Sequence, residues 1–382
     1  MTNISSAMII RSLLIGFICC LTLPKLSFAQ QTQAANETAS IQGTLQVLAD
    51  EFKMTKLNRT RKIWVYLPPG YHDNAPQAYP VLYMQDGQTL FDANYSNTKD
   101  EWRIDETLDA LYNSGKITGV IVVGIESVEE LRADEYGPYY NSGKDQGGDG
   151  PLYADFIIND LKPYVDANYR TLPGRQHTAI GGASLGGLIS LYMLRQHNNV
   201  FGMGAIFSPV IWFNREDMYN LYSSTRENEK SRNFLVASKQ EKGADAMIKD
   251  LNVIYNLMER SKAVGSKNLL RFAEEGQHNE SFYQKEFELA FLYLFNPENI
   301  TGIDDYFEDP DFRVYPNPVS NSLNVKYTSA LGNLTITDIT GRTVAKWFAG
   351  NSPEETVDVS GLAKGQYIIH TNNGLRKVFI KL

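Results

Sequence analysis

Short apolar runs and longer amphipathic segments alternate along residues 44–296. The apolar runs predict β-strands, at residues 45–48, 63–67, 79–84, 120–124, 178–180, 204–207, 233–237 and 269–272. The amphipathic segments between them predict helices, at residues 101–111, 153–165, 188–194, 246–258 and 286–294. Strands that alternate with helices form a mostly parallel sheet with helices on both faces, so we expect an α/β fold for this region.

The pattern changes near residue 296. Residues 297–312 are rich in Asp and Glu and contain two prolines, which is typical of a linker. After it the apolar positions alternate and turn residues separate the runs, at 323–327, 334–337, 343–348 and 367–370. We therefore expect a small β-sandwich over residues 313–382, after the α/β domain over residues 44–296.

The first 29 residues have the pattern of an export signal. Arg11 precedes the apolar stretch 12–23, and Ser27-Phe28-Ala29 is a small-x-small cleavage site, so we expect a signal peptide cut after Ala29. The apolar stretch is shorter than the ~20 residues that a spanning helix needs, so we expect no transmembrane anchor in the mature chain. The polar residues 30–43 predict a flexible segment.

Composition excludes several kinds of chemistry. Both cysteines, Cys19 and Cys20, lie in the signal segment, so the exported chain would have no disulfide, cysteine nucleophile or cysteine zinc ligand. The net charge is -8 and no stretch is dense in Lys or Arg, so we expect no nucleic-acid partner. Asp145 and Asp149 in a Gly-rich loop are too few and wrongly spaced for a calcium loop. We expect neither a metal nor a cofactor.

The strongest chemical motif is the pentapeptide Gly182-Ala-Ser184-Leu-Gly186. It lies between a predicted strand and a predicted helix, where a tight turn would push the Ser184 hydroxyl out of the sheet. A Gly-rich turn without chemistry is the alternative. A suitably placed histidine later in the chain argues against that alternative, so Ser184 is the predicted nucleophile.

A serine hydroxyl needs a neighbouring base. His278 follows the last predicted strand and precedes the last predicted helix, at the sheet edge where reactive groups gather in open α/β sheets. The order Ser then His is that of α/β-hydrolases. The remaining histidines lie in loops, at the far end of the Ser184 strand or helix, or in the β-rich region: His72, His177, His197 and His370. His278 is the predicted base.

The acid that orients His278 should follow a strand between Ser184 and His278. Glu241 is the first choice and Asp245 the second, and a Ser-His dyad without an acid is also consistent with the sequence. An oxyanion hole needs two backbone N–H donors. We expect them from Leu185, directly after the nucleophile, and from Gln88, in the turn after an early central strand.

Aromatic residues gather in the loops near these strand ends. Trp102, Tyr136 and Trp212 are the candidates for substrate binding, either as walls of an apolar acyl pocket or as surfaces on which sugar rings stack.

Residues 45–296 resemble the Putative esterase family, the esterase D and feruloyl esterase-like group of α/β-hydrolases. The resemblance is carried by segments that occur in order, at residues 79–92 (with Asp-Gly-Gln-Thr-Leu-Phe-Asp), 135–138, 161–171, 182–188, 207–212 and 276–280 (Gly-Gln-His-Asn-Glu). One segment departs from the family. Relatives often read L-D-V-G-T-x-E before the acid, whereas residues 235–241 retain Glu241 at the matching place but not the Gly-Thr.

Residues 314–382 resemble the type A C-terminal sorting domain of the type IX secretion system. The resemblance lies in residues 314–318 (Val-Tyr-Pro-Asn-Pro), 334–342, 357–367 and 377–382. It implies that the secretion machinery is a partner and that the protein reaches the outside of a Gram-negative cell, attached to the surface or released.

These observations together predict a secreted serine esterase that works through a Ser-His-acid triad and an acyl-enzyme. Its expected substrates are small-molecule or polysaccharide esters, with carbohydrate-linked feruloyl or acetyl groups as the first choice. A siderophore esterase or an acyltransferase would use the same site. The alternative of another class is an inactive binding module displayed on the cell surface.

Overall fold

The computed structural model describes residues 42–73, 76–296, 312–327, 331–338, 342–350, 352–371 and 376–382. The predicted signal peptide at 1–29 lies outside the described residues. So do residues 30–41 of the predicted flexible segment and residues 297–311 of the predicted linker.

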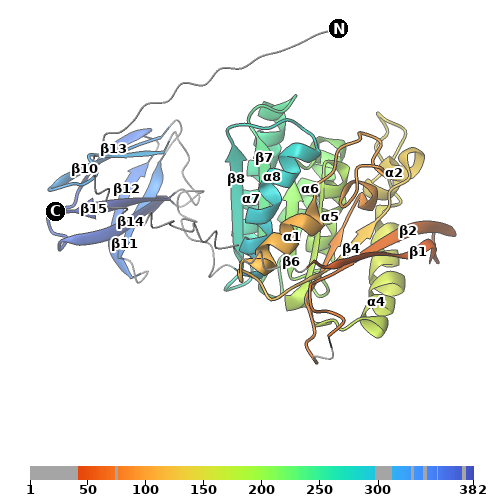
Figure 1. The fold of residues 1–382 in the computed structure, drawn as a ribbon. Coiled ribbons are helices and arrows are strands. Elements are labelled where there is room, and N and C mark those ends of the chain that lie inside the picture. Colours follow the sequence, from red (N-terminus) through yellow and green to blue (C-terminus); the bar gives the residue numbers. More distant parts are fainter. Residues whose placement is uncertain are drawn as a thin grey trace, which may run out of the picture. The chain divides into compact units, whose positions relative to one another are not determined.

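An eight-stranded sheet forms the centre of the first region, with strand order β1-β2-β4-β3-β5-β6-β7-β8 (Figure 1). Its strands are β1 (Thr44–Met54), β2 (Arg59–Leu67), β3 (Val81–Met84), β4 (Ile121–Ile125), β5 (Thr178–Ala183), β6 (Met203–Phe207), β7 (Arg232–Ser238) and β8 (Lys267–Ala273). Strand β2 pairs antiparallel with β1 and β4, and every other neighbouring pair is parallel. The predicted mostly parallel sheet is therefore confirmed.

Helices cover both faces of this sheet. They are α1 (Ile104–Asn113), α2 (Glu129–Tyr136), α3 (Gly150–Asp155), α4 (Lys162–Asn168), α5 (Leu185–Gln196), α6 (Arg215–Ser224), α7 (Ala244–Ser261) and α8 (Glu280–Phe295). A π-helical turn over Phe156–Leu161 joins α3 to α4. The sequence pattern did not predict α2 or α6.

Alternate side chains of the central strands enter two separate hydrophobic cores, because successive side chains of a strand point to opposite faces. In β7, Leu235 and Ala237 join the core formed with α3 to α7, whereas Phe234 and Val236 join the core formed with α1 and α8. Burial on both faces explains why the central strands read as continuous apolar runs.

The carboxyl ends of the parallel strands meet at one edge of the sheet. Five residues follow five of these strands there: Asp86 after β3, Ser184 after β5, Ser208 after β6, Glu241 after β7 and His278 after β8. The topology thus brings together side chains that lie almost 200 residues apart in the chain.

The C-terminal region, taken by itself, is built from strands only among its described residues. One sheet has the order β13-β10-β9 and the other β12-β11-β14-β15. The strands are β9 (Arg313–Tyr315), β10 (Ser322–Lys326), β11 (Gly332–Asp338), β12 (Thr343–Gly350), β13 (Glu354–Asp358), β14 (Gly365–Thr371) and β15 (Arg376–Lys381), and all paired strands are antiparallel. Leu323 and Val357 from one sheet share a core with Ile336 and Phe379 from the other, as in a small sandwich.

None of the helices in the described parts of the chain has the length and apolar character needed to cross a bilayer.

Candidate active site

Ser184 forms a sharp turn between β5 and α5. Its backbone has φ 59° and ψ -122°, a region that residues other than glycine rarely occupy. Three hydrogen bonds hold this backbone. The Ser184 N–H donates to Phe207 O over 3.1 Å, and Ser184 O accepts from the N–H groups of Leu188 and Val210 over 3.1 and 3.2 Å. The turn therefore has the strained strand-to-helix geometry that the pentapeptide predicts.

The two glycines of the pentapeptide allow β3 to approach this turn closely. A Cβ atom on Gly182 would lie 2.9 Å from the Cβ of Gln85, and one on Gly186 would lie 2.9 Å from that atom and 3.0 Å from Asp86 Oδ2. Contacts this short do not occur between well-packed atoms. Both positions therefore require the absence of a side chain.

His278 and Glu241 lie next to each other at the ends of β8 and β7. The Nδ1 atom of His278 is 2.6 Å from Oε2 of Glu241. The Glu241 side chain is completely buried, whereas 33% of the His278 side chain is exposed. Asp245, the second choice for the acid, is exposed in the first turn of α7.

The second oxygen of Glu241 is also satisfied. Oε1 accepts a hydrogen bond from Ser208 Oγ over 2.6 Å and another from the Ser238 N–H over 2.7 Å. Burial favours the neutral form of this carboxyl, but the hydrogen bonds from His278, Ser208 and Ser238 outweigh burial, so the pKa of Glu241 lies below its ordinary value. Glu241 is thus a buried carboxylate that stays ionised.

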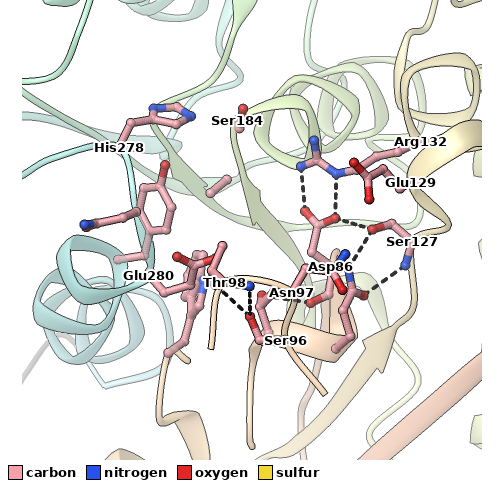
Figure 2. Close-up of a pocket in the computed structure, with 16 residues that line it drawn as sticks. Asp86, Ser96, Asn97, Thr98, Ser127, Glu129, Arg132, Ser184, His278 and Glu280 are labelled. Carbon is pink, nitrogen blue, oxygen red and sulfur yellow. Dashed lines mark hydrogen bonds and ion pairs between the residues drawn. The ribbon is translucent and has the colours of Figure 1, made fainter. Parts of the chain in front are cut away.

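Ser184 and His278 face a pocket of about 420 Å³ (Figure 2). Most of its lining side chains are polar or charged. The lining residues are Asp86, Gln88, Thr89, Ser96, Asn97, Thr98, Trp102, Ser127, Glu129, Arg132, Ala183, Ser184, His278, Asn279, Glu280 and Tyr283. The ring of His278 points across the pocket towards Ser184 in Figure 2.

One wall of this pocket is a network around Asp86, which the sequence did not single out. Arg132 of α2 donates from Nε to Asp86 Oδ1 over 2.7 Å and from Nη2 to Oδ2 over 2.9 Å. Ser127 Oγ donates to Asp86 Oδ1 over 2.7 Å, and the side-chain amide of Gln88 exchanges hydrogen bonds with Ser127 Oγ and the Ser127 N–H. The network fixes the turn that follows β3 (Figure 2).

The three aromatic candidates have different positions. Trp102 lines the pocket and packs against Phe207 and Tyr283. Tyr136 is fully buried, and its hydroxyl accepts a hydrogen bond from the Asp86 N–H over 3.1 Å, so it supports the pocket wall from beneath and cannot contact substrate there. Trp212 is 46% exposed and is not among the lining residues. Tyr136 and Trp212 are therefore not among the residues that line this pocket, and the role of Trp212 in substrate binding stays a prediction.

The predicted oxyanion donors belong to the turns that follow two neighbouring strands, β3 and β5. Leu185 is the first residue of α5, and Gln88 lies in a 3-10 turn over Gly87–Thr89 that follows β3. Which N–H groups would hold an oxyanion stays a prediction. Within the described ranges, no group of three or more His, Cys, Asp and Glu side chains is arranged to hold a metal ion.

A strand-serine-helix turn on a mostly parallel sheet, with a histidine and a carboxylate after later strands, defines an α/β-hydrolase. The family model described as Putative esterase matches residues 54–296, so the chain belongs to that family. It is an enzyme of the carboxylic ester hydrolase class. A second family model, the secretion system C-terminal sorting domain, matches residues 313–382 and indicates export to the cell surface or secretion.

Two relatives match part of the chain. The protein YbbA of Bacillus subtilis (strain 168) is 24% identical over 252 residues, which make up 63% of this chain and 95% of YbbA. The ferri-bacillibactin esterase BesA of the same organism is 26% identical over 203 residues, which make up 48% of this chain and 68% of BesA.

Solved structures share the fold. A ferulic acid esterase matches with a TM-score of 0.50 at 18% identity, covering 67% of this chain and 98% of that structure. An IroE-like serine hydrolase from Shewanella oneidensis matches with a TM-score of 0.55 at 19% identity, covering 68% of this chain and 82% of that structure.

Proposed function

We propose that the protein hydrolyses carboxylic esters with Ser184 as nucleophile, His278 as general base and acid, and Glu241 as the carboxylate that orients His278. The contact of 2.6 Å between His278 Nδ1 and Glu241 Oε2 carries this proposal. A carboxylate at Nδ1 holds the proton on that nitrogen, which leaves Nε2 as the acceptor for the proton of the serine hydroxyl.

The reaction follows from these roles. Ser184 Oγ attacks the ester carbonyl carbon while its proton passes to His278 Nε2. The tetrahedral oxyanion would accept hydrogen bonds from the N–H groups of Leu185 and Gln88. His278 then gives its proton to the alcohol oxygen as the C–O bond breaks, which leaves an acyl-enzyme. Water attacks the acyl carbon while its proton passes to His278. His278 then gives this proton to Ser184 Oγ as the bond to the acyl carbon breaks, which releases the acid and free Ser184.

The pocket favours uncharged, hydroxyl-rich esters over anionic ones. Among its described lining residues, Asp86, Glu129 and Glu280 are acidic, and the guanidinium of Arg132 is already paired with Asp86. A siderophore ester that carries negative charge would meet this acidic surface, whereas sugar hydroxyls can both donate to and accept from it. We therefore propose carbohydrate-linked esters, with feruloyl or acetyl groups, as the substrates.

Two of the similar proteins have names that state an ester substrate, and these correspond to the two substrate choices. Similarity to a ferulic acid esterase supports the carbohydrate choice, and similarity to a ferri-bacillibactin esterase supports a siderophore ester. The acidic side chains that line the pocket support the carbohydrate choice.

Hydrolysis of a panel of 4-nitrophenyl acyl esters and methyl hydroxycinnamates by the full chain tests the proposal, with Ser184→Ala as the matched control. We expect turnover that Ser184→Ala abolishes without any change in thermal unfolding. Turnover retained in Ser184→Ala would refute the mechanism. Failure of the wild type to react with a fluorophosphonate probe would instead support the inactive binding module, and acyl transfer to an added acceptor alcohol would identify an acyltransferase.

The export route is a separate proposal. We propose that residues 1–29 are removed as a signal peptide and that residues 313–382 address the enzyme to the type IX secretion machinery, which the family match to a sorting domain supports. Intact mass of the exported enzyme tests this, because an N-terminus other than Gln30 would contradict the cleavage site.

A further inference from the structure

Ser208 is a buried residue in a strained conformation, directly after β6. Its φ is 41°, in the left-handed region that favours glycine, and no part of it is exposed. A non-glycine residue persists in this region only when the surrounding structure holds it there. The backbone N–H of Ser208 is held by Val236 O of β7 over 2.7 Å.

The turn that contains Ser208 contacts both parts of the proposed catalytic machinery. On one side, Phe207 O accepts from the Ser184 N–H and the Val210 N–H donates to Ser184 O. On the other side, the Ser208 hydroxyl donates to Glu241 Oε1 over 2.6 Å. Residues 207–210 therefore hold the nucleophile by its backbone and the acid by its side chain.

Helix α5 has a glycine, Gly187, where it packs against this turn. A Cβ atom on Gly187 would lie 3.1 Å from Phe207 O and 3.2 Å from Pro209 Cβ, so α5 packs closely against the turn. The ring of Pro209, the residue after Ser208, fixes its own φ angle and so restricts the turn further. A displacement of residues 207–210 would therefore change the positions of Ser184 and Glu241 together.

We propose that Ser208 is a positioning residue that sets the orientation of Glu241 and, through it, of His278. The inference rests on the proposed function, in which Glu241 orients the catalytic histidine. With Ser208 and the Ser238 N–H on Oε1, the carboxylate is fixed so that Oε2 faces His278. Without the Ser208 hydroxyl, one donor is lost and the carboxylate gains freedom to turn about its last bond.

The strain at Ser208 allows its two possible roles to be separated. Glycine accepts a φ of 41° without strain but lacks the hydroxyl, so Ser208→Gly removes the hydrogen bond and keeps the turn. A purely structural residue would lose activity only as far as it loses stability. A positioning residue would lose activity in a protein that unfolds at the same or a higher temperature.

The experiment compares Ser208→Gly and Ser208→Ala with Ser266→Ala in the full chain. Ser266 is a matched control, since its buried hydroxyl donates to the carboxylate of Glu227 over 2.7 Å, away from the pocket lining. We expect Ser208→Gly to lower kcat by about 10- to 100-fold, with KM within about twofold of the wild type and an unchanged or higher Tm. Ser266→Ala should keep kcat.

The pH profile provides a second readout. The titratable side chains that interact with Glu241 are His278 and Tyr283. The Ser208 hydroxyl is one of the donors that lower the pKa of Glu241, so Ser208→Gly should let this carboxylate take up a proton at a higher pH. We therefore expect the acid limb of kcat/KM for Ser208→Gly to move to higher pH.

Different failures have different meanings. A Ser208→Gly variant with kcat within about twofold of the wild type would overturn the inference. If Glu241→Gln in parallel loses activity, the proposed triad stands and only the role of Ser208 falls. If Glu241→Gln also keeps its activity, the role of the acid falls as well. Should Ser208→Ala fail to fold, Ser208→Gly still decides the question.

Discussion

Asp86 and Arg132 form a bidentate ion pair on the wall of the pocket, with contacts of 2.7 and 2.9 Å. The side chains are 16% and 26% exposed, so neither charge is fully solvated. Asp86 itself stands in the left-handed region with φ 57°, at the start of the turn that carries Gln88. The ion pair therefore holds a strained turn beside the nucleophile.

Replacement of Arg132 by Met should impair both stability and activity. It leaves the Asp86 carboxylate mostly buried without its charged partner, which costs about 1–3 kcal/mol of the free energy of unfolding. The turn after β3 then loses its support, so kcat/KM should fall. Urea unfolding and initial rates measure the two effects.

Arg215→Met is the matched control for that variant. Arg215 makes the same bidentate contact with Asp250, at 2.8 and 2.8 Å, away from the pocket lining. It should lose stability and keep kcat/KM. If Arg132→Met also keeps kcat/KM, the network has no part in holding the turn for catalysis.

The choice of acid can be tested with two amides. Glu241→Gln replaces the oxygen at His278 Nδ1 by a group that can donate, which favours the wrong histidine tautomer, and should lower kcat by about 10³- to 10⁴-fold. Asp245→Asn, at the exposed start of α7, should leave kcat unchanged. Loss of activity in Asp245→Asn alone would reverse the assignment, and retention in both would leave a Ser-His dyad.

Glu241 should also make stability depend on pH. Its pKa in the folded state lies below the ordinary 4.5, so the unfolded chain binds the proton more readily. The stabilisation is present above the ordinary pKa and is lost as pH falls through the folded value. The acid side of a plot of Tm against pH should therefore be flatter for Glu241→Gln than for the wild type. Equal acid slopes would contradict this.

Asp105 at the start of α1 should have the opposite effect. Burial, together with the neighbouring Glu106 carboxylate, raises its pKa to about 7 from 3.8. The folded state then binds a proton that the unfolded state releases between these values, so stability falls as pH rises through this window. Asp105→Asn should add on the order of 1–3 kcal/mol to the free energy of unfolding near pH 8 and much less near pH 4.

Asp217→Asn is the control for the Asp105 variant. Asp217 lies in the first turn of α6 and is exposed, so its replacement should have little effect at either pH. An Asp105→Asn variant with the same stability gain at both pH values would exclude titration of Asp105 as the cause.

Alanine at Gly186 should damage the nucleophile turn. The new Cβ would press against Gln85 and Asp86 at 2.9 and 3.0 Å, and overpacking of this kind costs about 1–3 kcal/mol. Because the displaced turn carries Ser184, labelling by a fluorophosphonate should slow as well. Gly143→Ala is the control, since its Cβ would meet only Asn141 Oδ1 at an ordinary 3.4 Å. Equal labelling rates in the two variants would contradict the steric argument.

The strands of the α/β region, most of its helices and the nucleophile turn could be predicted from the sequence because each leaves a local pattern, whereas the short strands β9, β13 and β15 were not predicted. The exceptions have local reasons. Helix α2 is mostly charged and buries only Glu135 and Tyr136, so it has no apolar stripe. Helix α6 buries Met218, Leu221 and Tyr222, a spacing of three and four that would have identified it.

The site was only partly predictable, because much of it depends on contacts between distant segments. Chain order pointed to Ser184, His278 and Glu241, but nothing local indicated that Arg132 pairs with Asp86 or that Ser208 contacts Glu241. The sequence did not indicate which way the side chains of the aromatic loop residues point. Tyr136 points into the core and Trp102 into the pocket, which only the packing of the helices decides.

The positive φ angles of Ser184 and Ser208 set thermal stability against activity in this fold. Each costs about 1–3 kcal/mol relative to a relaxed backbone. Glycine at either position should yield a protein of equal or higher heat resistance and a poorer or inactive esterase. Selection for thermal resistance alone would therefore be expected to erase the serines on which turnover depends, so any search for a hardier enzyme has to screen for ester cleavage at every round.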